Sequence, residues 1–431
     1  MIKDRTTTES APVSSNEISA LKGKRHVPVN LRNSGDFEAK MLLSQRVRKS
    51  PYHHLSQAAG CWCFTVYNRV YHPRAYVPLD EGGLMTEYKS LTEDVTMWNV
   101  AVERQIQVKG PDAAKFTDLV ITRSVDKIQP GKARYVILCN QYGGILNDPV
   151  LLRPAEDEFW FSLADSDIGI YLQGVAAVTD YDVEVQEIDV CPVQIQGPKA
   201  PALMKALVGN GIDDVPYYGL MQNVQVGGCD VTISRSGFSA EAGYEIYLHD
   251  ATLNAEKMWN AVLEAGEAFH LRVIAPGHIR RIEAGILSWG QDMDVETNPY
   301  QCGLGWQVDL SKETFIGKDA LAKIKEEGVT HKLAGVRMGG EPVTWYPADF
   351  YHVYKDGEVV GYITSGFYSP TQGCNIGYAM LPTNLTEIGT KLEVKLEDKY
   401  AEEPVWAEVA ETPFKKPHDP GTGLLTTGSK L

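Results

Sequence analysis

The sequence lacks the short motifs that mark several large enzyme classes. It has no G-x-x-x-x-G-K-[ST] loop, no G-x-G-x-x-G after a strand, no H-E-x-x-H and no G-x-S-x-G. None of its ten histidines stands four residues from another, so no helix face offers two imidazoles to a metal. We therefore expect no metal site, and the pattern disfavours phosphate-loop, zinc and serine-hydrolase chemistry.

Long apolar runs and an excess of positive charge are also missing. No run approaches the roughly 20 apolar residues that span a bilayer, and the polar N-terminal residues contain no apolar core of signal-peptide type. The 56 acidic residues outnumber the 41 basic ones, which gives a net charge of −15. This balance argues against nucleic acid or a membrane as partner. We expect a soluble cytoplasmic protein, a monomer or homodimer, that acts on a small molecule.

Cysteine is present at seven positions but forms no C-x-x-C pair, which is typical of reduced thiols in a cytoplasm. Cys61 and Cys63 lack a third and a fourth ligand at suitable spacing. They are better explained as small buried side chains than as metal ligands.

A repeat reveals the organisation of the chain. The segment IQVKGPDA at 106–113 recurs as VQIQGPKA at 193–200, an offset of 87 residues between Gly110 and Gly197 (197 − 110). Each copy predicts a strand, a Gly-Pro turn and a helix, and each helix is followed by a hairpin, at 135–152 and 231–248. The chain is therefore expected to contain a duplicated α+β unit. If the copies are related by an approximate two-fold axis, their hairpins face each other across a cleft.

Other segments carry simpler patterns. From about Lys332 onward, short strands separated by turn residues predict a small antiparallel β-barrel. Helices are predicted at 39–50 and 85–97, and a single strand at 61–71 is expected to run into a proline-rich loop. Asp165 or Ser166 is the expected N-cap of the helix that follows.

Two carboxylates stand out in the two hairpins. Glu245 lies between Tyr244 and Ile246 in a strand, where burial is costly unless hydrogen bonds are donated to it. Its partner is either Arg235 across the hairpin or a ligand with paired N–H groups. Asp148 is either a turn residue of the Asn-Asp-Pro sequence or a carboxylate at a strand edge, facing Glu245 across the cleft.

The N-terminal aromatic and basic cluster also permits two interpretations. It is either a strand end that enters a loop, or a pocket wall whose donors bind an anionic or aromatic substrate. Its members are Tyr67, Arg69, Tyr71, His72, Arg74 and Tyr76. Farther on, Arg280 and Arg281 are adjacent and cannot both serve one partner, so one of them is expected to be free for a ligand carboxylate.

The collinear series GPDA, GGILND, GPKA, RSGFSAEAGYEIY, RRIEAGILSWGQDMD, NPYQCGL, FIGKDAL and IGYAM resembles the aminomethyltransferase superfamily, typified by the glycine-cleavage T-protein. The segments RKSPYHHLSQAAG, FTVYN, WNVAVERQIQVKG, SLADSD and SRSGFS are most similar to its tetrahydrofolate-dependent demethylase branch. The likeness is greatest to the dimethylsulfoniopropionate demethylases and more distant to the aromatic O-demethylases.

This resemblance implies an α+β, three-domain cloverleaf around a tetrahydrofolate channel. The expected parts are an N-terminal extension (1–45), two interleaved α+β folate-binding domains (46–330), a C-terminal β-barrel (331–417) and a tail (418–431). Glu245 matches the glutamate that clamps the pterin, and Asp148 matches the aspartate near folate N5. Further folate contacts are expected from Arg235, Tyr142 and Arg281.

The resemblance also implies roles in binding the methyl donor. Tyr247 matches a position beside the substrate in the sulfonium branch, and Tyr67 matches a tyrosine that assists the leaving group in the O-demethylases, so both join Asp148 as catalytic candidates. The expected substrate wall comprises Trp62, Tyr67, Arg69, Tyr71, Trp160 and Tyr247. Arg69 stands where the sulfonium branch has histidine, and Ala101 and Val102 stand where the aromatic branch has one.

The expected reaction moves a one-carbon group from a small S- or O-methylated donor to N5 of tetrahydrofolate, and the local motifs favour a sulfonium. The alternatives are an O-demethylase or methylene transferase acting on methoxylated or methylenedioxy aromatics, an aminomethyltransferase, and a folate-binding protein without catalysis.

Overall fold

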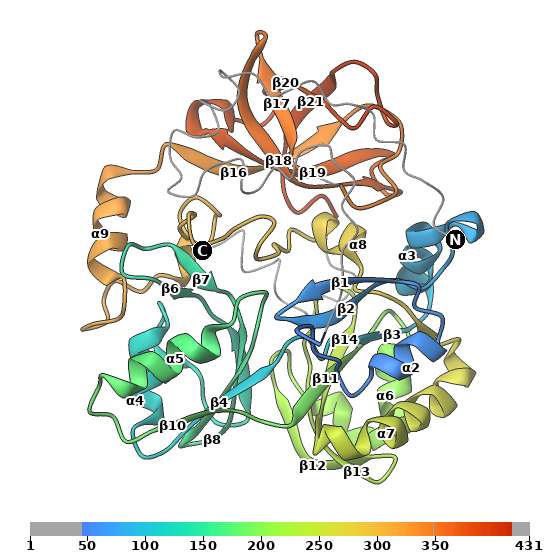
Figure 1. Cartoon of the computed structure of the whole chain (residues 1–431), viewed down its shortest axis with the longest axis vertical. Helices are drawn as coiled ribbons and strands as arrows, with labels where there is room; N and C mark the ends of the chain where they lie inside the picture. The colour runs from blue at the N-terminus through green and yellow to red at the C-terminus, as the bar shows by residue number, and fades with distance from the viewer. Residues whose placement is uncertain (1–44, 348, 416–431) are drawn as a thin grey trace. The chain divides into compact units, whose positions relative to one another are not determined.

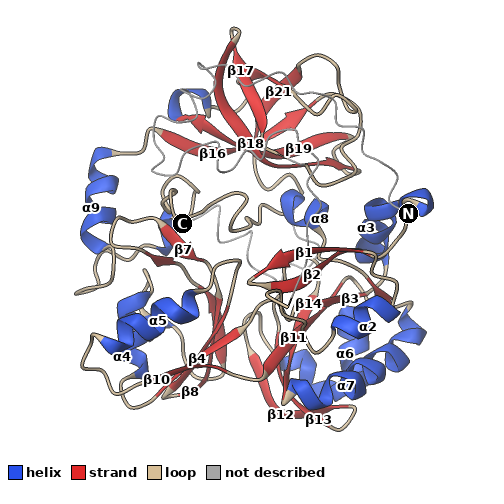
Figure 2. Cartoon of the chain, in the orientation of Figure 1, coloured by secondary structure: helices blue, strands red, loops and turns tan. Residues whose placement is uncertain are grey.

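The computed structural model describes residues 45–347 and 349–415. The described residues form two compact units, one of residues 46–328 and one of residues 329–414. Figure 2 shows that both strands and helices build the larger unit. Within the described ranges, no helix is long and apolar enough to cross a membrane. The predicted tail and most of the predicted N-terminal extension lie outside the described residues.

The first sheet of the larger unit is antiparallel, with the strand order β10-β4-β9-β8-β5. Its strands are β4 (Gln105–Lys109), β5 (Lys132–Tyr135), β8 (Val150–Ala155), β9 (Glu158–Ser162) and β10 (Glu184–Glu187). Helices α4 (Ala113–Val120) and α5 (Ile168–Ala177) pack on one face (Figure 1), where Phe116 and Leu172 join Ile106 and Phe161 in a buried core.

The second sheet has the order β12-β13-β14-β11-β3-β15. Its strands are β3 (Thr96–Asn99), β11 (Val190–Gln196), β12 (Leu220–Val226), β13 (Cys229–Ser234), β14 (Gly243–His249) and β15 (Arg272–Val273). Helices α6 (Ala200–Val208) and α7 (Ala251–Gly266) cover one face, with Met204 and Trp259 packed in one core with Ile195 and Ile246.

The duplication expected from the sequence is present, and the two copies exchange a strand. In both, a strand leads through glycine into a helix: β4 to α4 and β11 to α6. However, β3, which precedes the first copy, pairs with β11, and β10, which precedes the second, pairs with β4. Gly110 and Gly197 have φ values of +141° and +130°, and a Cβ there would come within 2.4 and 2.5 Å of the carbonyl oxygens of Asp182 and Asp94. Both crossings therefore require glycine.

The remaining elements of this unit are short. They are α2 (His53–Ala58), β1 (Cys63–Tyr67), β2 (Val70–Ala75), α3 (Gly83–Glu93), β6 (Leu138–Cys139), β7 (Ile145–Asn147), α8 (His278–Glu283) and α9 (Lys318–Glu327). The helix predicted at 39–50 is wrong for its described residues, which form a turn and a bridge from Arg48 to Val70.

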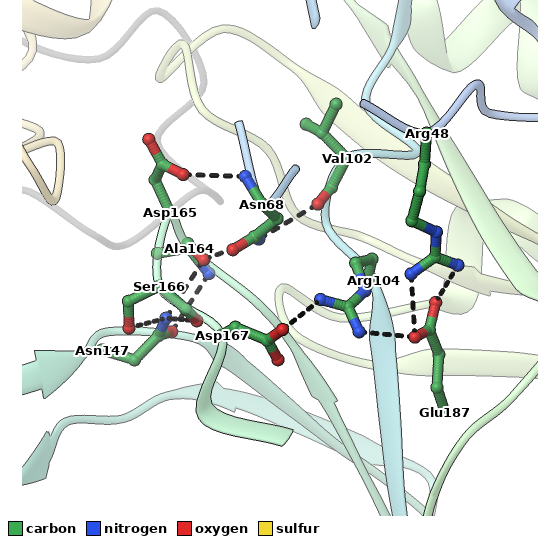
Figure 3. A network of polar contacts seen from close by, with 10 residues as sticks. All are labelled: Arg48, Asn68, Val102, Arg104, Asn147, Ala164, Asp165, Ser166, Asp167 and Glu187. Carbon is green, nitrogen blue, oxygen red and sulfur yellow. Dashed lines mark hydrogen bonds and ion pairs between the residues drawn. The ribbon is translucent and has the colours of Figure 1, made fainter. Parts of the chain in front are cut away.

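The strand predicted at 61–71 is instead the hairpin β1–β2, and the supposed loop after it is strand β2. Asn68 and Arg69 form the turn, with φ values of +50° and +61°. Asn68 is 4% exposed. Its backbone N–H donates to Asp165 Oδ1 at 2.8 Å and its amide donates to the carbonyls of Val102 and Ala164 (Figure 3). These bonds hold the left-handed turn in place, which an asparagine tolerates better than most residues.

The two predicted hairpins, 135–152 and 231–248, are not equivalent parts of the two copies. The pair that matches β13–β14 is β8–β9, because both pairs continue the same sheet order after the helix. The segment 135–152 instead contains a separate two-stranded sheet, β6–β7, inserted before β8.

The smaller unit is a closed barrel with the order β16-β19-β18-β17-β20-β21, which confirms the predicted C-terminal barrel. Its strands are β16 (His331–Met338), β17 (Tyr351–Lys355), β18 (Glu358–Ser369), β19 (Cys374–Pro382), β20 (Lys391–Val394) and β21 (Val405–Ala410). Val336, Val353, Leu381 and Val409 fill its interior.

Candidate active site

The strand β14 directs alternate side chains to two different environments. Tyr244, Ile246 and Leu248 pack in the core beneath α6 and α7. On the opposite face, Tyr247 is buried in a cluster with Trp160 of the first sheet. Glu245 lies on this second face, so it is placed between the two duplicated copies.

Three side chains donate hydrogen bonds to Glu245, which is 3% exposed. Gln194 Nε2 donates to Oε1 at 2.8 Å, while the hydroxyls of Ser236 and Tyr247 donate to Oε2 at 2.9 and 2.6 Å. Burial raises the pKa of Glu245, and these three bonds counteract the shift. The site therefore supports a buried carboxylate.

Glu103, which the sequence interpretation missed, is the third acidic residue of this region. It lies between β3 and β4, and Ser162 Oγ donates to its Oε2 at 3.1 Å. Burial, followed by the charges of Glu245 and Asp148, raises the pKa of Glu103 well above its ordinary value. Burial acts in the same direction on Glu245, so the pKa values of both carboxyl groups are raised. The one signal in the sequence was an acidic residue following the apolar run WNVAV.

Asp148 lies just before β8, and Tyr135 donates its hydroxyl proton to Oδ2 at 2.9 Å. The other oxygen, Oδ1, is buried and has no hydrogen-bond partner among the described residues. Burial raises the pKa of Asp148 to about 7, against the lowering effect of the Tyr135 bond. Because the charges of both Asp148 and Glu245 act on Glu103, we refer to the three carboxyl groups together as the three-carboxyl site.

Two of the predicted tyrosines adjoin this site. Tyr67 is half-buried at the end of β1, and the charges of Glu103 and Asp148 add to burial in raising the pKa of its hydroxyl well above the usual value. Tyr247 is fully buried, and its pKa is raised in the same way by burial and by Glu245. Both phenols therefore keep their protons at neutral pH and act as donors.

The other expected wall residues occupy different environments. Trp160 is 4% exposed, and its indole donates to Glu158 Oε1. Tyr71 packs against the ring of His53 at 4.9 Å. Trp62 is 45% exposed and its indole N–H donates to the Val77 carbonyl. The last wall residue, Arg69, is exposed at the β1–β2 turn. Tyr142, which was expected to contact the folate, is 75% exposed.

The expectation that Arg280 or Arg281 is free for a ligand carboxylate stays a prediction. Among the described residues, Nη1 and Nη2 of Arg280 are buried and have no hydrogen-bond partner, although Nη1 lies 3.9 Å from a carboxylate oxygen of Glu283. Both guanidinium groups are fully buried: Arg280 Nε donates to Glu241 at 2.6 Å, and Arg281 pairs with Asp292.

Arg235 does not lie opposite Glu245, as the hairpin interpretation required. The register of β13 and β14 places Ser234 opposite Glu245, and Arg235 follows the end of the strand. Its guanidinium donates to the Val215 carbonyl at 3.2 Å.

The N-cap of helix α5 is Asp167, rather than the predicted Asp165 or Ser166, and its side chain makes no cap bond among the described residues. Asp167 instead pairs with Arg104 at 2.9 Å, and Asp165 accepts the Asn68 N–H (Figure 3). Their charges thus join neighbouring segments rather than cap the helix.

Unsatisfied acceptors provide a test of whether a folate fits here. Within the described part of the chain, Gln194 Oε1 and Asp148 Oδ1 are both buried without a hydrogen-bond partner. Gln194 donates to Glu245, and the charge of Asp148 acts on Glu103. A buried acceptor left unpaired costs about 1–3 kcal/mol. A pterin presents amino and ring N–H groups along one edge. These groups can donate the hydrogen bonds that the two oxygen atoms lack. The residues present therefore fit tetrahydrofolate.

Comparison with known proteins agrees with this geometry. The model of the GCVT N-terminal domain matches residues 52–312, and the model of the glycine cleavage T-protein C-terminal barrel domain matches residues 331–416. The chain therefore belongs to the aminomethyltransferase (glycine cleavage T-protein) family. It is a tetrahydrofolate-dependent one-carbon transferase.

Two relatives and one solved structure illustrate the range of this family. The chain is 35% identical to the dimethylsulfoniopropionate demethylase of Ruegeria pomeroyi, over 84% of this chain and 96% of that one. It is 32% identical to an aminomethyltransferase of Clostridium botulinum, over 75% and 88% of the two chains. The crystal structure of aminomethyltransferase T from Bartonella henselae has the same fold, with a TM-score of 0.75 at 22% identity, over 86% and 99% of the chains.

Proposed function

We propose that this protein is a demethylase that transfers a methyl group from a small cationic sulfonium compound to N5 of tetrahydrofolate. The observation that carries the proposal is the three-carboxyl site of Glu103, Asp148 and Glu245, bordered by the rings of Tyr67 and Tyr247. The 35% identity to a dimethylsulfoniopropionate demethylase supports the same assignment.

Electrostatics favours a cationic donor. When a methyl group leaves a sulfonium for an amine, one positive charge is present from start to finish and moves from sulfur to nitrogen. Carboxyl groups around the path stabilise that charge at every stage, and aromatic rings add cation–π attraction. An aryl methyl ether instead releases a phenolate, whose new negative charge would develop beside the same acidic groups.

We propose distinct roles for the residues around the folate. Glu245 and Gln194 accept hydrogen bonds from the pterin edge and fix its orientation. When bound, tetrahydrofolate supplies a secondary amine, N5, that accepts the methyl group and loses a proton. Asp148, whose pKa is about 7, is suited to take this proton, because a base of matched pKa is the most effective near neutral pH. Burial of the surrounding groups excludes water from the methyl group.

Two alternatives each have a specific observation in their favour. Tyr67 keeps its proton and could donate it to a leaving phenolate, which favours an O-demethylase. The 32% identity to aminomethyltransferases favours transfer of an aminomethyl carbon. In neither case does the donor explain the acidic environment as directly as a sulfonium does.

The test is incubation of the protein with tetrahydrofolate and each of several donors, followed by mass analysis of the folate. Formation of 5-methyl-tetrahydrofolate with a sulfonium but not with an aryl methyl ether is expected. Formation of 5,10-methylene-tetrahydrofolate would instead assign a methylenedioxy or aminomethyl donor. Folate binding without turnover of any donor would eliminate the enzymatic proposal.

A further inference from the structure

One loop of the larger unit accepts hydrogen bonds from two asparagines of other segments. The loop comprises residues 163–167, between β9 and α5, and we call it the Ala164 loop. Figure 3 shows Asn68 of the β1–β2 turn and Asn147 at the end of β7 pointing toward it. Asn68 Nδ2 donates to the Ala164 carbonyl at 2.8 Å, and Asn147 Nδ2 donates to the same oxygen at 3.1 Å. The two asparagines therefore share one acceptor.

The side chain of Asn147 pairs with both backbone groups of Ala164, as a neighbouring strand would. Besides its bond to the Ala164 carbonyl, it accepts the Ala164 N–H at Oδ1, at 3.0 Å. Its amide also lies 3.0 Å from the Ser166 carbonyl. Asn147 is fully buried, so water does not compete for these bonds. The Ala164 loop and the end of β7 are thus joined at several points.

Each asparagine is next in the chain to a side chain of the proposed site. Tyr67 precedes Asn68, and Asp148 follows Asn147. Consecutive Cα atoms are about 3.8 Å apart, so an asparagine that is held in place also restrains the backbone of its neighbour. The charge of Asp148 acts on the Tyr67 hydroxyl, which places the two side chains near each other.

Glu103 is connected to the same loop from both sides. The residue before it, Val102, accepts a hydrogen bond at its carbonyl from Asn68 Nδ2 at 3.1 Å. The residue after it, Arg104, pairs with Asp167 of the Ala164 loop at 2.9 Å (Figure 3). The loop is therefore linked to all three segments that carry Tyr67, Glu103 and Asp148.

We propose that Asn68 and Asn147 are positioning residues, which set the distance between the Tyr67 hydroxyl and the Asp148 carboxyl group through the shared Ala164 carbonyl. This inference rests on the proposed function, in which both groups adjoin the reacting atoms. Neutral amides suit the task because they do not titrate, so their hydrogen bonds persist while a nearby carboxyl group changes its charge. A displacement of about 1 Å at a reacting group can cost about 100-fold in rate.

The first test is Asn68→Gly, which permits the left-handed turn and keeps the backbone N–H but removes the amide. With dimethylsulfoniopropionate as donor, kcat should fall by about 10- to 100-fold. The Kd for tetrahydrofolate should stay within about twofold, because Gln194 and Glu245 lie on the second sheet. Asn223→Gly is the matched control, since Asn223 is exposed and has a similar φ of +54°, and it should change neither value. An unchanged kcat in Asn68→Gly, or an equal loss of folate affinity, would overturn the inference.

A double-variant cycle tests whether the two asparagines act through one carbonyl. Asn147→Ala should also lower kcat, and the combined variant should lose no more than about threefold beyond the poorer single variant, because groups that share a partner are not additive. Losses that multiply would show independent roles and contradict the proposal. If Asn147→Ala does not fold, Asn147→Asp replaces it in the cycle, because a carboxylate still accepts the Ala164 N–H.

Hydrogen–deuterium exchange of the folate-free protein separates this inference from the proposed function. Asn68→Gly should accelerate exchange by about 3- to 10-fold at 64–70 and also at 145–150 and 163–167, because the loss of one bond loosens the shared loop. Coupled exchange without methyl transfer by the wild type would retain the connection through Ala164 and reject the demethylase. Faster exchange confined to 64–70 would overturn the connection, whatever the activity.

Discussion

Gln194 of β11 and Glu245 of β14 stand directly opposite each other in the antiparallel register, and the amide of the first donates to the carboxylate of the second at 2.8 Å. The pair joins two neighbouring strands at the position where we place the pterin. Because the glutamine oxygen has no partner in the part of the chain that the structure describes, the pair presents acceptors from both residues.

Replacing Glu245 by glutamine should weaken tetrahydrofolate binding by about 10- to 100-fold, since a charged acceptor becomes neutral while the volume stays the same. Isothermal titration calorimetry measures the effect. Glu184→Gln on the exposed edge strand β10 is the matched control and should leave the affinity unchanged. An unaltered affinity in Glu245→Gln would remove this residue from the pterin site.

Replacing Gln194 by leucine should also weaken folate binding, by about 5- to 20-fold, because one acceptor for the ligand and one donor to Glu245 are lost. The duplication supplies the control. Gln107 is the equivalent residue of the first copy (194 − 87) and donates to Glu158 instead. Gln107→Leu should therefore keep the folate affinity. Similar effects in both variants would indicate a general loss of stability, which thermal denaturation would reveal.

The rate of methyl transfer should increase with pH through about 7, because Asp148 must lose its proton before it can act as a base. The measurement is kcat/KM between pH 5.5 and 8.5. Asp148→Asn should lower the rate by about 100-fold or more and abolish this rise. A wild-type profile that is flat across pH 7 would contradict the assignment of Asp148.

The titration of Asp148 should lower the stability of the folded protein as pH rises, whereas it should raise the rate of methyl transfer. Its pKa in the folded protein is raised above the unfolded value, so its contribution to the free energy of unfolding decreases as pH rises from about 4 to about 7. Asp148→Asn removes this dependence. Compared with the wild type at the same pH, the variant should therefore be more stable at pH 8 than at pH 5, as measured by urea denaturation. If the variant loses the same stability at pH 5 and at pH 8, the loss of the Tyr135 hydrogen bond determines its stability rather than the titration of Asp148.

Glu187 should stabilise the exchanged strand β10. Arg104 and Arg48 both pair with it, at 2.5 and 2.7 Å (Figure 3), and their bonds lower its pKa to about 2. The stabilisation is complete above the unfolded pKa of about 4.5 and is lost as pH falls toward 2. Because the pair is partly exposed, Glu187→Gln should cost about 1 kcal/mol at pH 7. Glu184→Gln on the same strand should cost almost nothing.

The sequence predicted the features that depend on local patterns. The repeat around Gly110 and Gly197 revealed the duplication, because both crossings need the same residue. Glu245 was identifiable because a carboxylate in an apolar strand demands partners. The barrel strands were visible from their turns. By contrast, Asn68 and Arg69 form a tight turn without glycine, so the hairpin was interpreted as one strand.

Long-range features were not accessible from one sequence. Nothing in the segment around Glu103 indicates that Glu245 and Asp148 raise its pKa, because those neighbours are distant along the chain. Likewise, Arg281 and Asp292 find each other only through the fold. The domain limits within 46–330 stay a prediction.

The exchange of β3 and β10 makes the two copies depend on each other for their completion. The first sheet acquires its edge strand only after Glu187 has been synthesised, and the second uses Thr96–Asn99, which precede its own copy by almost a hundred residues. Neither copy expressed as a separate fragment would contain all the strands of its sheet. The two halves of this unit are thus interlocked, because each half supplies a strand to the sheet of the other.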